Sequence, residues 1–194
     1  TRGTTSLFVM NADGTSARKL ADSLDVRGAA SWSPDGEWLV IAANKGEGTR
    51  LFKVPVAGGQ PVELLDTLSF NPVWSPDGRF IMYSEQQSAG QLEVKAITPE
   101  RVPVSIVELP IVGLGGATRY RFLPDGKALV VLEGTIGASQ NFVRVDLTSG
   151  QRRQLTALKA GSVIRDFDVS PDGRQIVFDR LRDNSDIVLM NLTR

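Results

Sequence analysis

The stretch "SWSPDGEWLV" at residues 31–40 decides the fold, because three variants of it follow along the chain. They read "VWSPDGRFIM" at 73–82, "RFLPDGKALV" at 121–130 and "DVSPDGRQIV" at 168–177. The prolines of the four copies are separated by 42, 48 and 47 residues. Self-similarity at such a period is typical of proteins built from repeated structural units. The chain is therefore expected to fold as a series of equivalent units.

Each copy has the pattern of a β-hairpin. Proline sets φ near −65° at the first corner of a type I turn, aspartate suits the next position, and glycine accepts the left-handed conformation that closes the hairpin. The predicted turns are Pro34, Asp35 and Gly36; Pro76, Asp77 and Gly78; Pro124, Asp125 and Gly126; and Pro171, Asp172 and Gly173. The four glycines are expected at positive φ. The four aspartates are interpreted as turn residues rather than as a carboxylate cluster.

Apolar segments on both sides of these turns complete a four-stranded unit. Third strands are predicted at 50–56, 91–97, 141–147 and 186–192, and fourth strands at 61–65, 103–109 and 152–156. Four antiparallel strands in 40 to 50 residues, repeated, are the pattern of a β-propeller blade. The fold class is thus all-β, with about four and a half blades. The aromatic residues two before each proline, Trp32, Trp74 and Phe122, are expected to pack between sheets.

The whole chain, 1–194, is predicted to be a single propeller or a portion of one. Complete blades are expected at 27–65, 70–109 and 118–156. A partial blade at 1–22 and a blade at 165–194 that lacks its outer strand flank them. Residues 6–22 align with third and fourth strands, so further blades or domains are expected upstream. A four-blade ring closed by residues 1–22 is the alternative.

Composition limits the chemistry of these residues. The 22 basic and 22 acidic residues cancel, so no attraction to nucleic acid is expected. There is no apolar run of about 18 residues for membrane insertion. The absence of histidine and cysteine removes the usual general base, the thiol nucleophile and the commonest metal ligands, so no metal or cofactor is expected. The absence of cysteine is compatible with the cytoplasm and with an extracytoplasmic space, so the location stays open, with a periplasmic or other extracytoplasmic location slightly favoured.

The repeat resembles the PD40, or TolB-like, subgroup of WD40-like β-propellers. Its repeat combines an aromatic residue, Ser-Pro-Asp-Gly, an apolar strand and a later Leu-Thr. Three of the four turns match in full, Leu123 replaces serine in the third, and "QLT" at 154–156 supplies the Leu-Thr. The resemblance covers nearly the whole chain. It implies a six-bladed propeller within a larger bacterial protein.

A candidate binding surface follows from blade geometry. Connections between blades gather on the face opposite the Pro-Asp-Gly turns, and loops on a rigid scaffold commonly carry recognition. Residues at similar offsets before the first strands are predicted to approach the channel mouth: Arg27, Asn71, Arg119, Tyr120 and Arg165. Arginine offers planar, bidentate donors, which suit a carboxylate or an anionic peptide end. The alternative is a set of ordinary surface arginines paired with acids such as Asp166.

Three functions remain open from sequence. The favoured one is a non-enzymatic module that binds a protein or peptide partner, and on this view the chain is not an enzyme. The second is the propeller that gates substrate access in a prolyl-oligopeptidase-like or tricorn-like serine peptidase. The catalytic domain of such an enzyme would lie outside this chain, because neither its Gly-x-Ser-x-Gly motif nor a histidine occurs here. The third is a hydrolase or lyase with a channel-bound metal, which would need oxygen ligands.

Overall fold

The computed structural model describes residues 3–46, 48–87, 92–109, 119–134, 139–158 and 163–179. All regular elements in these ranges are β-strands, from β1 to β16, which confirms the all-β class. No helix long and apolar enough to span a membrane occurs in the described ranges.

Three four-stranded antiparallel sheets form the middle of the molecule, and in each the strand order follows the sequence. Blade 2 comprises β3 (Asp25–Trp32), β4 (Trp38–Asn44), β5 (Thr49–Pro55) and β6 (Val62–Glu63). Blade 3 comprises β7 (Ser69–Trp74), β8 (Ile81–Gln86), β9 (Leu92–Ile97) and β10 (Pro103–Val104). Blade 4 comprises β11 (Tyr120–Phe122), β12 (Ala128–Glu133), β13 (Asn141–Asp146) and β14 (Arg152–Gln154).

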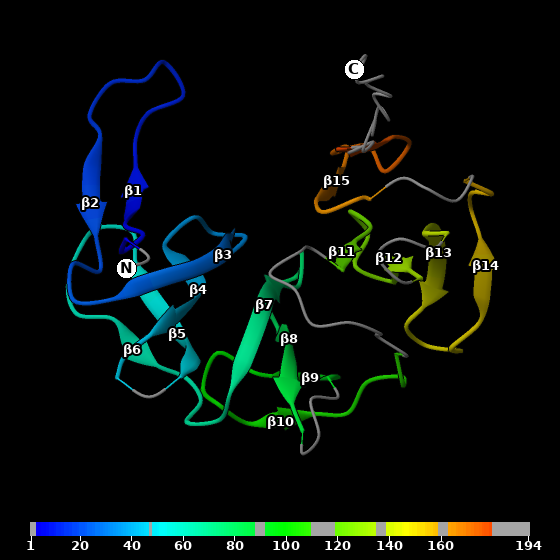
Figure 1. Cartoon of the computed structure of the whole chain (residues 1–194), viewed down its shortest axis with the longest axis horizontal. Coiled ribbons are helices and arrows are strands. Elements are labelled where there is room, and N and C mark those ends of the chain that lie inside the picture. Colours follow the sequence, from blue (N-terminus) through cyan, green and yellow to red (C-terminus); the bar gives the residue numbers. More distant parts are fainter. Residues whose placement is uncertain are drawn as a thin grey trace, which may run out of the picture.

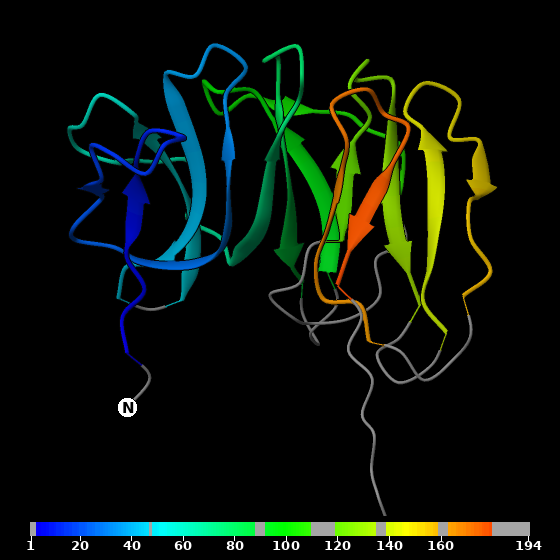
Figure 2. The same cartoon turned by 90° about the horizontal axis from the view of Figure 1, so that it is seen from above.

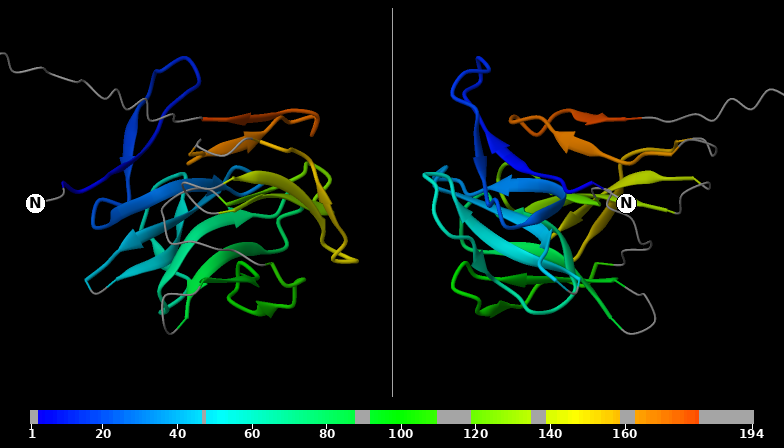
Figure 3. Two further views of the ribbon diagram at one scale, coloured as in Figure 1. Left: turned by 45° about the vertical axis from the view of Figure 1, so that its right-hand side comes forward. Right: turned by 60° about the vertical axis from the view of Figure 1, so that its left-hand side comes forward.

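A two-stranded sheet lies at each end of this series. Blade 1 pairs β1 (Leu7–Val9) with β2 (Arg18–Leu20), and blade 5 pairs β15 (Phe167–Val169) with β16 (Ile176–Phe178). The third strand predicted at 186–192 lies outside the described residues. The sheets follow one another in an arc with β3, β7, β11 and β15 on the inner side (Figure 1). Blades 1 and 5 are its two ends (Figure 3). This arrangement confirms the propeller prediction.

The strands of all blades run between the same two faces of the molecule, and a row of hairpin turns lies on one of these faces (Figure 2). The predicted Pro-Asp-Gly turns are confirmed, since Gly36, Gly78, Gly126 and Gly173 have φ of +73°, +76°, +68° and +71°. In each turn the aspartate Oδ1 accepts the backbone N–H two residues later, at 3.0 Å for Glu37 and for Arg174. Ser33 and Ser170 also donate their hydroxyls to Asp35 and Asp172.

These bonds explain why Asp35 and Asp172 are more acidic than a free aspartate. The Ser33 hydroxyl and then the Glu37 amide hold the pKa of Asp35 below its usual value of 3.8. Ser170 and the Arg174 amide act in the same way on the pKa of Asp172. The carboxylates serve as local acceptors, as the sequence predicted, because hydrogen bonds to the charged form favour it.

A contact between successive turns was not foreseen. A Cβ added to Gly78 would lie 3.7 Å from Pro34 Cδ, and one added to Gly126 would lie 3.7 Å from Pro76 Cδ. A Cβ added to Gly173 would lie 3.0 Å from Pro124 Cδ, whereas a Cβ added to Gly36 would have no atom within 4 Å. Each glycine from blade 3 onward thus faces the proline of the preceding blade. We call this series of contacts the turn ladder.

The hydrophobic core lies between the blades. Val40 and Leu51 of blade 2 cluster with Trp74 and Ile81 of blade 3. Similar clusters join blades 1 and 2, blades 3 and 4, and blades 4 and 5. Because each neighbour covers a sheet face, strands such as β4 and β12 are buried along nearly their whole length.

The expectation that all three aromatics pack between sheets is only partly correct. Trp74 and Phe122 are 7% and 8% exposed, but Trp32 is 51% exposed. Trp74 is covered by side chains from β4 and β5, the second and third strands of the preceding blade. The described part of blade 1 contains only β1 and β2, and their apolar residues cluster with Leu39, Ile41 and Phe52 instead. Trp32 therefore lacks an equivalent cover.

Candidate functional site

Of the five residues predicted at the channel mouth, Arg27, Asn71 and Tyr120 lie in first strands, whereas Arg119 and Arg165 come just before β11 and β15. In blade 2, β3 pairs regularly with β4 as far as Arg27, and the register then shifts before Ser31. In blade 3, a shift between Phe70 and Val73 encloses Asn71, which has φ of +50°. Bulges of this kind re-aim side chains near a sheet edge. Of the five predicted residues, Asn71 lies within such a bulge, whereas Arg27 and Tyr120 are regularly paired with Ala42 and Val131.

Arg27 has a counter-ion of its own. Its guanidinium pairs with the Asp25 carboxylate, two residues earlier on the same strand, and both side chains are partly exposed. This geometry fits the alternative of a surface ion pair, which contributes little to stability. A ligand contact by Arg27 stays a prediction.

Asn71 and Tyr120 join two blades. The Tyr120 hydroxyl of blade 4 donates to the Asn71 carbonyl oxygen of blade 3 at 2.8 Å. Tyr120 is only 1% exposed, and burial raises the pKa of its hydroxyl, which keeps the group protonated as a donor. These two residues therefore tie the inner strands together.

Arg165 is exposed, and its backbone N–H donates to Asp179 Oδ1 at 2.8 Å. Asp166, the acid suggested as an arginine partner, lies 4.0 Å from Arg121 Nη2 instead. Arg121 Nε also lies 3.5 Å from Asp168 Oδ1, so this arginine connects blade 4 to blade 5. Sequence analysis did not single out Arg121, because pairing across blades cannot be read from neighbouring residues.

Arg119 differs from the other arginines of the set. It is 2% exposed, and its Nε and Nη1 atoms are buried without a hydrogen-bond partner. Burial lowers the pKa of its guanidinium. A buried charge without a partner is costly, so an anion at this position would be favoured.

Gln140 is a buried polar residue that sequence analysis missed. Its Oε1 accepts the Ile164 N–H at 2.7 Å, and its Nε2 donates to the Ile164 carbonyl at 3.4 Å. The side chain thereby joins the start of β13 to the segment that precedes β15. A glutamine within "GASQN" gives no sequence signal for this role, because such a segment is typical of a surface loop.

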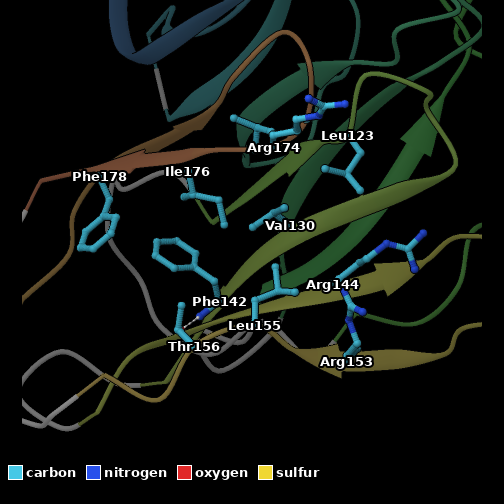
Figure 4. A pocket seen from close by; sticks show the side chains of 12 residues that line it. Leu123, Val130, Phe142, Arg144, Arg153, Leu155, Thr156, Arg174, Ile176 and Phe178 are labelled. Atoms are coloured by element: carbon cyan, nitrogen blue, oxygen red, sulfur yellow. Dashed lines mark hydrogen bonds between the residues drawn. The ribbon is translucent and has the colours of Figure 1, made fainter.

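A cavity of about 550 Å³ lies between blades 4 and 5. Phe142, Ile176 and Phe178 line one part of it, and arginines gather at the other (Figure 4). Two of these, Arg144 and Arg153, are direct cross-strand partners. At the equivalent interface between blades 3 and 4, Val143 and Val145 of β13, the third strand of blade 4, pack against the apolar side chains of blade 3. We therefore interpret this cavity as part of a blade interface.

No group of three or more His, Cys, Asp or Glu residues able to hold a metal occurs in the described ranges.

Comparison with known proteins places these features in context. No family model matches the chain. Over 150 residues it is 32% identical to a Bacillus subtilis (strain 168) protein named "Uncharacterized peptidase YuxL". The match covers 76% of this chain and 20% of that protein, so the chain spans about one fifth of the length of this relative.

Solved structures share the fold at low identity. A putative TolB from Agrobacterium tumefaciens matches with a TM-score of 0.72 and 19% identity over 93% of this chain and 64% of its own. A puromycin hydrolase mutant matches with a TM-score of 0.65 and 18% identity over 88% of this chain and 28% of its own. In fold, the chain is similar to TolB-like β-propellers.

These comparisons contradict the expectation that the protein is not an enzyme. The curated relative is named a peptidase, and one structural neighbour is a hydrolase. The expectation rested on the absence of histidine and cysteine from 194 residues. That absence limits the chemistry of these residues alone, because a propeller can serve an enzyme whose reacting groups lie elsewhere.

Proposed function

We propose that these residues belong to the propeller of a peptidase, and that they admit and position peptide substrates. The carrying observation is the 32% identity over 150 residues with YuxL. The sequence contains no histidine, so the histidine of a Ser-His-Asp triad would have to come from outside these residues. This proposal replaces the non-enzymatic scaffold favoured from sequence. The likeness to TolB supports the fold only, at 19% identity.

The geometry of the inner strands supports a positioning role. Hydrogen bonds between blades hold these strands, from Tyr120 Oη to the Asn71 carbonyl at 2.8 Å and from the Trp74 N–H to Ser31 Oγ at 3.0 Å. A rigid inner wall of this kind can select peptides by size and hold them in one orientation, which supports catalysis at a neighbouring site. The inner strands β3, β7, β11 and β15 would form the wall that a peptide passes (Figure 1).

The test uses the natural protein whose chain includes these residues. Hydrolysis of chromogenic peptides of increasing length is measured with and without a serine-reactive fluorophosphonate. We expect hydrolysis that the fluorophosphonate abolishes, with kcat/KM falling for the longest peptides. Absence of both hydrolysis and labelling would contradict the peptidase assignment.

A variant separates gating from catalysis. Tyr120→Phe removes the hydroxyl that ties blade 4 to blade 3 and loosens the inner wall. We expect fluorophosphonate labelling to persist while the ratio of kcat/KM for short and long peptides changes. An unchanged ratio in a folded variant would refute the gating role and leave the peptidase assignment standing.

A further inference from the structure

The strongest unexplained feature of the molecule is Arg119, which is 2% exposed and has two buried donor atoms, Nε and Nη1, without partners. We propose that Arg119 binds a carboxylate of a peptide ligand at the inner end of blade 4. The identification of the ligand as a peptide rests on the proposed function, whereas the anion site does not.

The direction of the side chain follows from strand alternation. Tyr120 reaches Asn71 in blade 3, so it points to that side of the sheet. Successive side chains of a strand point to opposite faces. Arg119 and Arg121 therefore point toward blade 5, and the ion pairs of Arg121 with Asp166 and Asp168 agree with this. Arg119 comes two residues before Arg121, and its carbonyl oxygen accepts a hydrogen bond from the Leu132 N–H at 2.8 Å.

The acids of this region already have other partners. Asp166 and Asp168 face Arg121, Glu133 pairs with Arg152, and Asp179 accepts backbone N–H groups of blade 5. The connecting sequences 110–118, 135–138 and 159–162 contain no aspartate or glutamate. Within residues 180–194, the acidic side chains are Asp183 and Asp186. A carboxylate from a ligand is therefore the simplest counter-ion for Arg119.

The chemistry of the guanidinium selects this class of ligand. Arginine stays protonated in proteins and offers donors but no acceptor, so a neutral carbonyl would leave its charge uncompensated. A carboxylate forms charge-assisted hydrogen bonds, which are shorter and stronger than neutral ones. Burial strengthens such a bond further, because the surrounding dielectric is low. Both a peptide C-terminus and an acidic side chain supply this group.

The first experiment tests the anion site by thermal unfolding of the 194-residue chain. Sodium acetate is compared with sodium chloride at equal ionic strength, for wild type, Arg119→Met, Arg119→Gln and the exposed control Arg165→Met. Linkage predicts that acetate at ten times its dissociation constant raises the Tm of wild type and of the control by about 3 to 6 °C. Acetate should not change the Tm of either Arg119 variant.

The same experiment distinguishes a ligand site from a structural role. Removing an unpaired buried charge should leave Arg119→Met at least as stable as wild type in chloride. If both Arg119 variants are destabilised in chloride and still respond to acetate like wild type, the proposal is wrong. An Asp183→Asn, Asp186→Asn double variant tests the chain's own acids. If this variant shows a larger acetate response than wild type, the counter-ion is internal and the ligand proposal is overturned.

The second experiment identifies the source of the carboxylate by calorimetry. The probes are an N-acetylated tripeptide with a free C-terminus, its C-terminal amide, and an amide with a central aspartate. We expect Arg119→Met to weaken binding of one acidic probe at least tenfold and to leave binding of the neutral amide unchanged. Equal binding of the acidic probes to wild type and variant would refute the inference and leave the peptidase proposal intact. An acetate response that depends on Arg119, with no peptide bound, would uphold the anion site and count against the peptide.

Discussion

The glycine of each Pro-Asp-Gly turn meets two requirements of different origin. Its positive φ closes the hairpin, and this was predictable because the turn residues are adjacent in sequence. From blade 3 onward it also faces a proline 44 to 50 residues earlier, and no local pattern indicates this contact. The repeat period shows that the turns are equivalent but not that they touch.

Alanine at two of these glycines separates the two requirements. At Gly36, φ is +73° and the space beside it is open, so Gly36→Ala should cost about 1–2 kcal/mol from the left-handed backbone alone. At Gly173, a Cβ would lie 3.0 Å from Pro124, so Gly173→Ala should cost more. Urea unfolding of both variants gives the comparison. Equal losses would show that the turn ladder imposes no steric limit.

The acidic turn aspartates predict a dependence of stability on pH. The folded-state pKa values of Asp35 and Asp172 lie below 3.8, so their contribution is present above that pH and is lost as pH falls through the folded values. The double variant Asp35→Asn, Asp172→Asn keeps an acceptor oxygen in each turn but cannot titrate. Its urea midpoint should fall less between about pH 4 and pH 2 than that of wild type. Parallel curves would contradict this assignment.

The blade interface is the unit of stability at the scale of the element. Sequence analysis located the strands because the repeat, the turns and the short apolar runs all indicate the same strand positions. It also placed Trp74 and Phe122 between sheets correctly, since both follow a complete blade. It misplaced Trp32, because the cover of this residue depends on strands of another blade rather than on its own hairpin.

Trp74 and Trp32 form a matched pair of equivalent positions. Trp74 is 7% exposed and donates its indole N–H to the Gly78 carbonyl at 3.2 Å, so Trp74→Ala should cost about 3–5 kcal/mol. Trp32 is 51% exposed, so Trp32→Ala should cost less than half of that. Free energies of unfolding from urea titration test the difference. Similar losses would mean that Trp32 is covered in solution.

The binding role of the candidate site residues stays a prediction, and their different environments could not be predicted from the sequence. Similar offsets before the first strands led to Arg27, Arg119 and Arg165 alike. Their environments differ because Arg27 follows Asp25 on its strand, Arg165 is exposed just before β15, and Arg119 is enclosed. Burial depends on neighbours distant in sequence, which residue offsets do not describe.

At the scale of the whole molecule, each blade contacts mainly the blades before and after it. The stability of such arrays is approximately a sum over units and their interfaces. Blade 3 has an apolar cluster on both sides and four strands, whereas blades 1 and 5 have two described strands each. The ends of the arc are therefore expected to open more easily than its middle.

Hydrogen exchange followed by mass spectrometry tests this expectation. Amides of β8 and β12 should exchange most slowly, because both strands are central and buried. Amides of β1, β2, β15 and β16 should exchange fastest among the strands. Uniform protection along the chain would contradict the nearest-neighbour description.

The turn ladder also gives the arc a direction. The turns of blades 3 and 4 each contribute a proline to one neighbour and a glycine to the other, so the contact is asymmetric and joins blades head to tail. Among the described residues nothing lies within 4 Å of the Cβ position on Gly36, so the glycine side of this contact is open there. Repetition of a heterologous contact forms a ring where the rotation closes and an open spiral where it does not. A whole repeat inserted between two blades by protein engineering would therefore preserve the contact, whereas a blade joined in the opposite sense would oppose proline to proline.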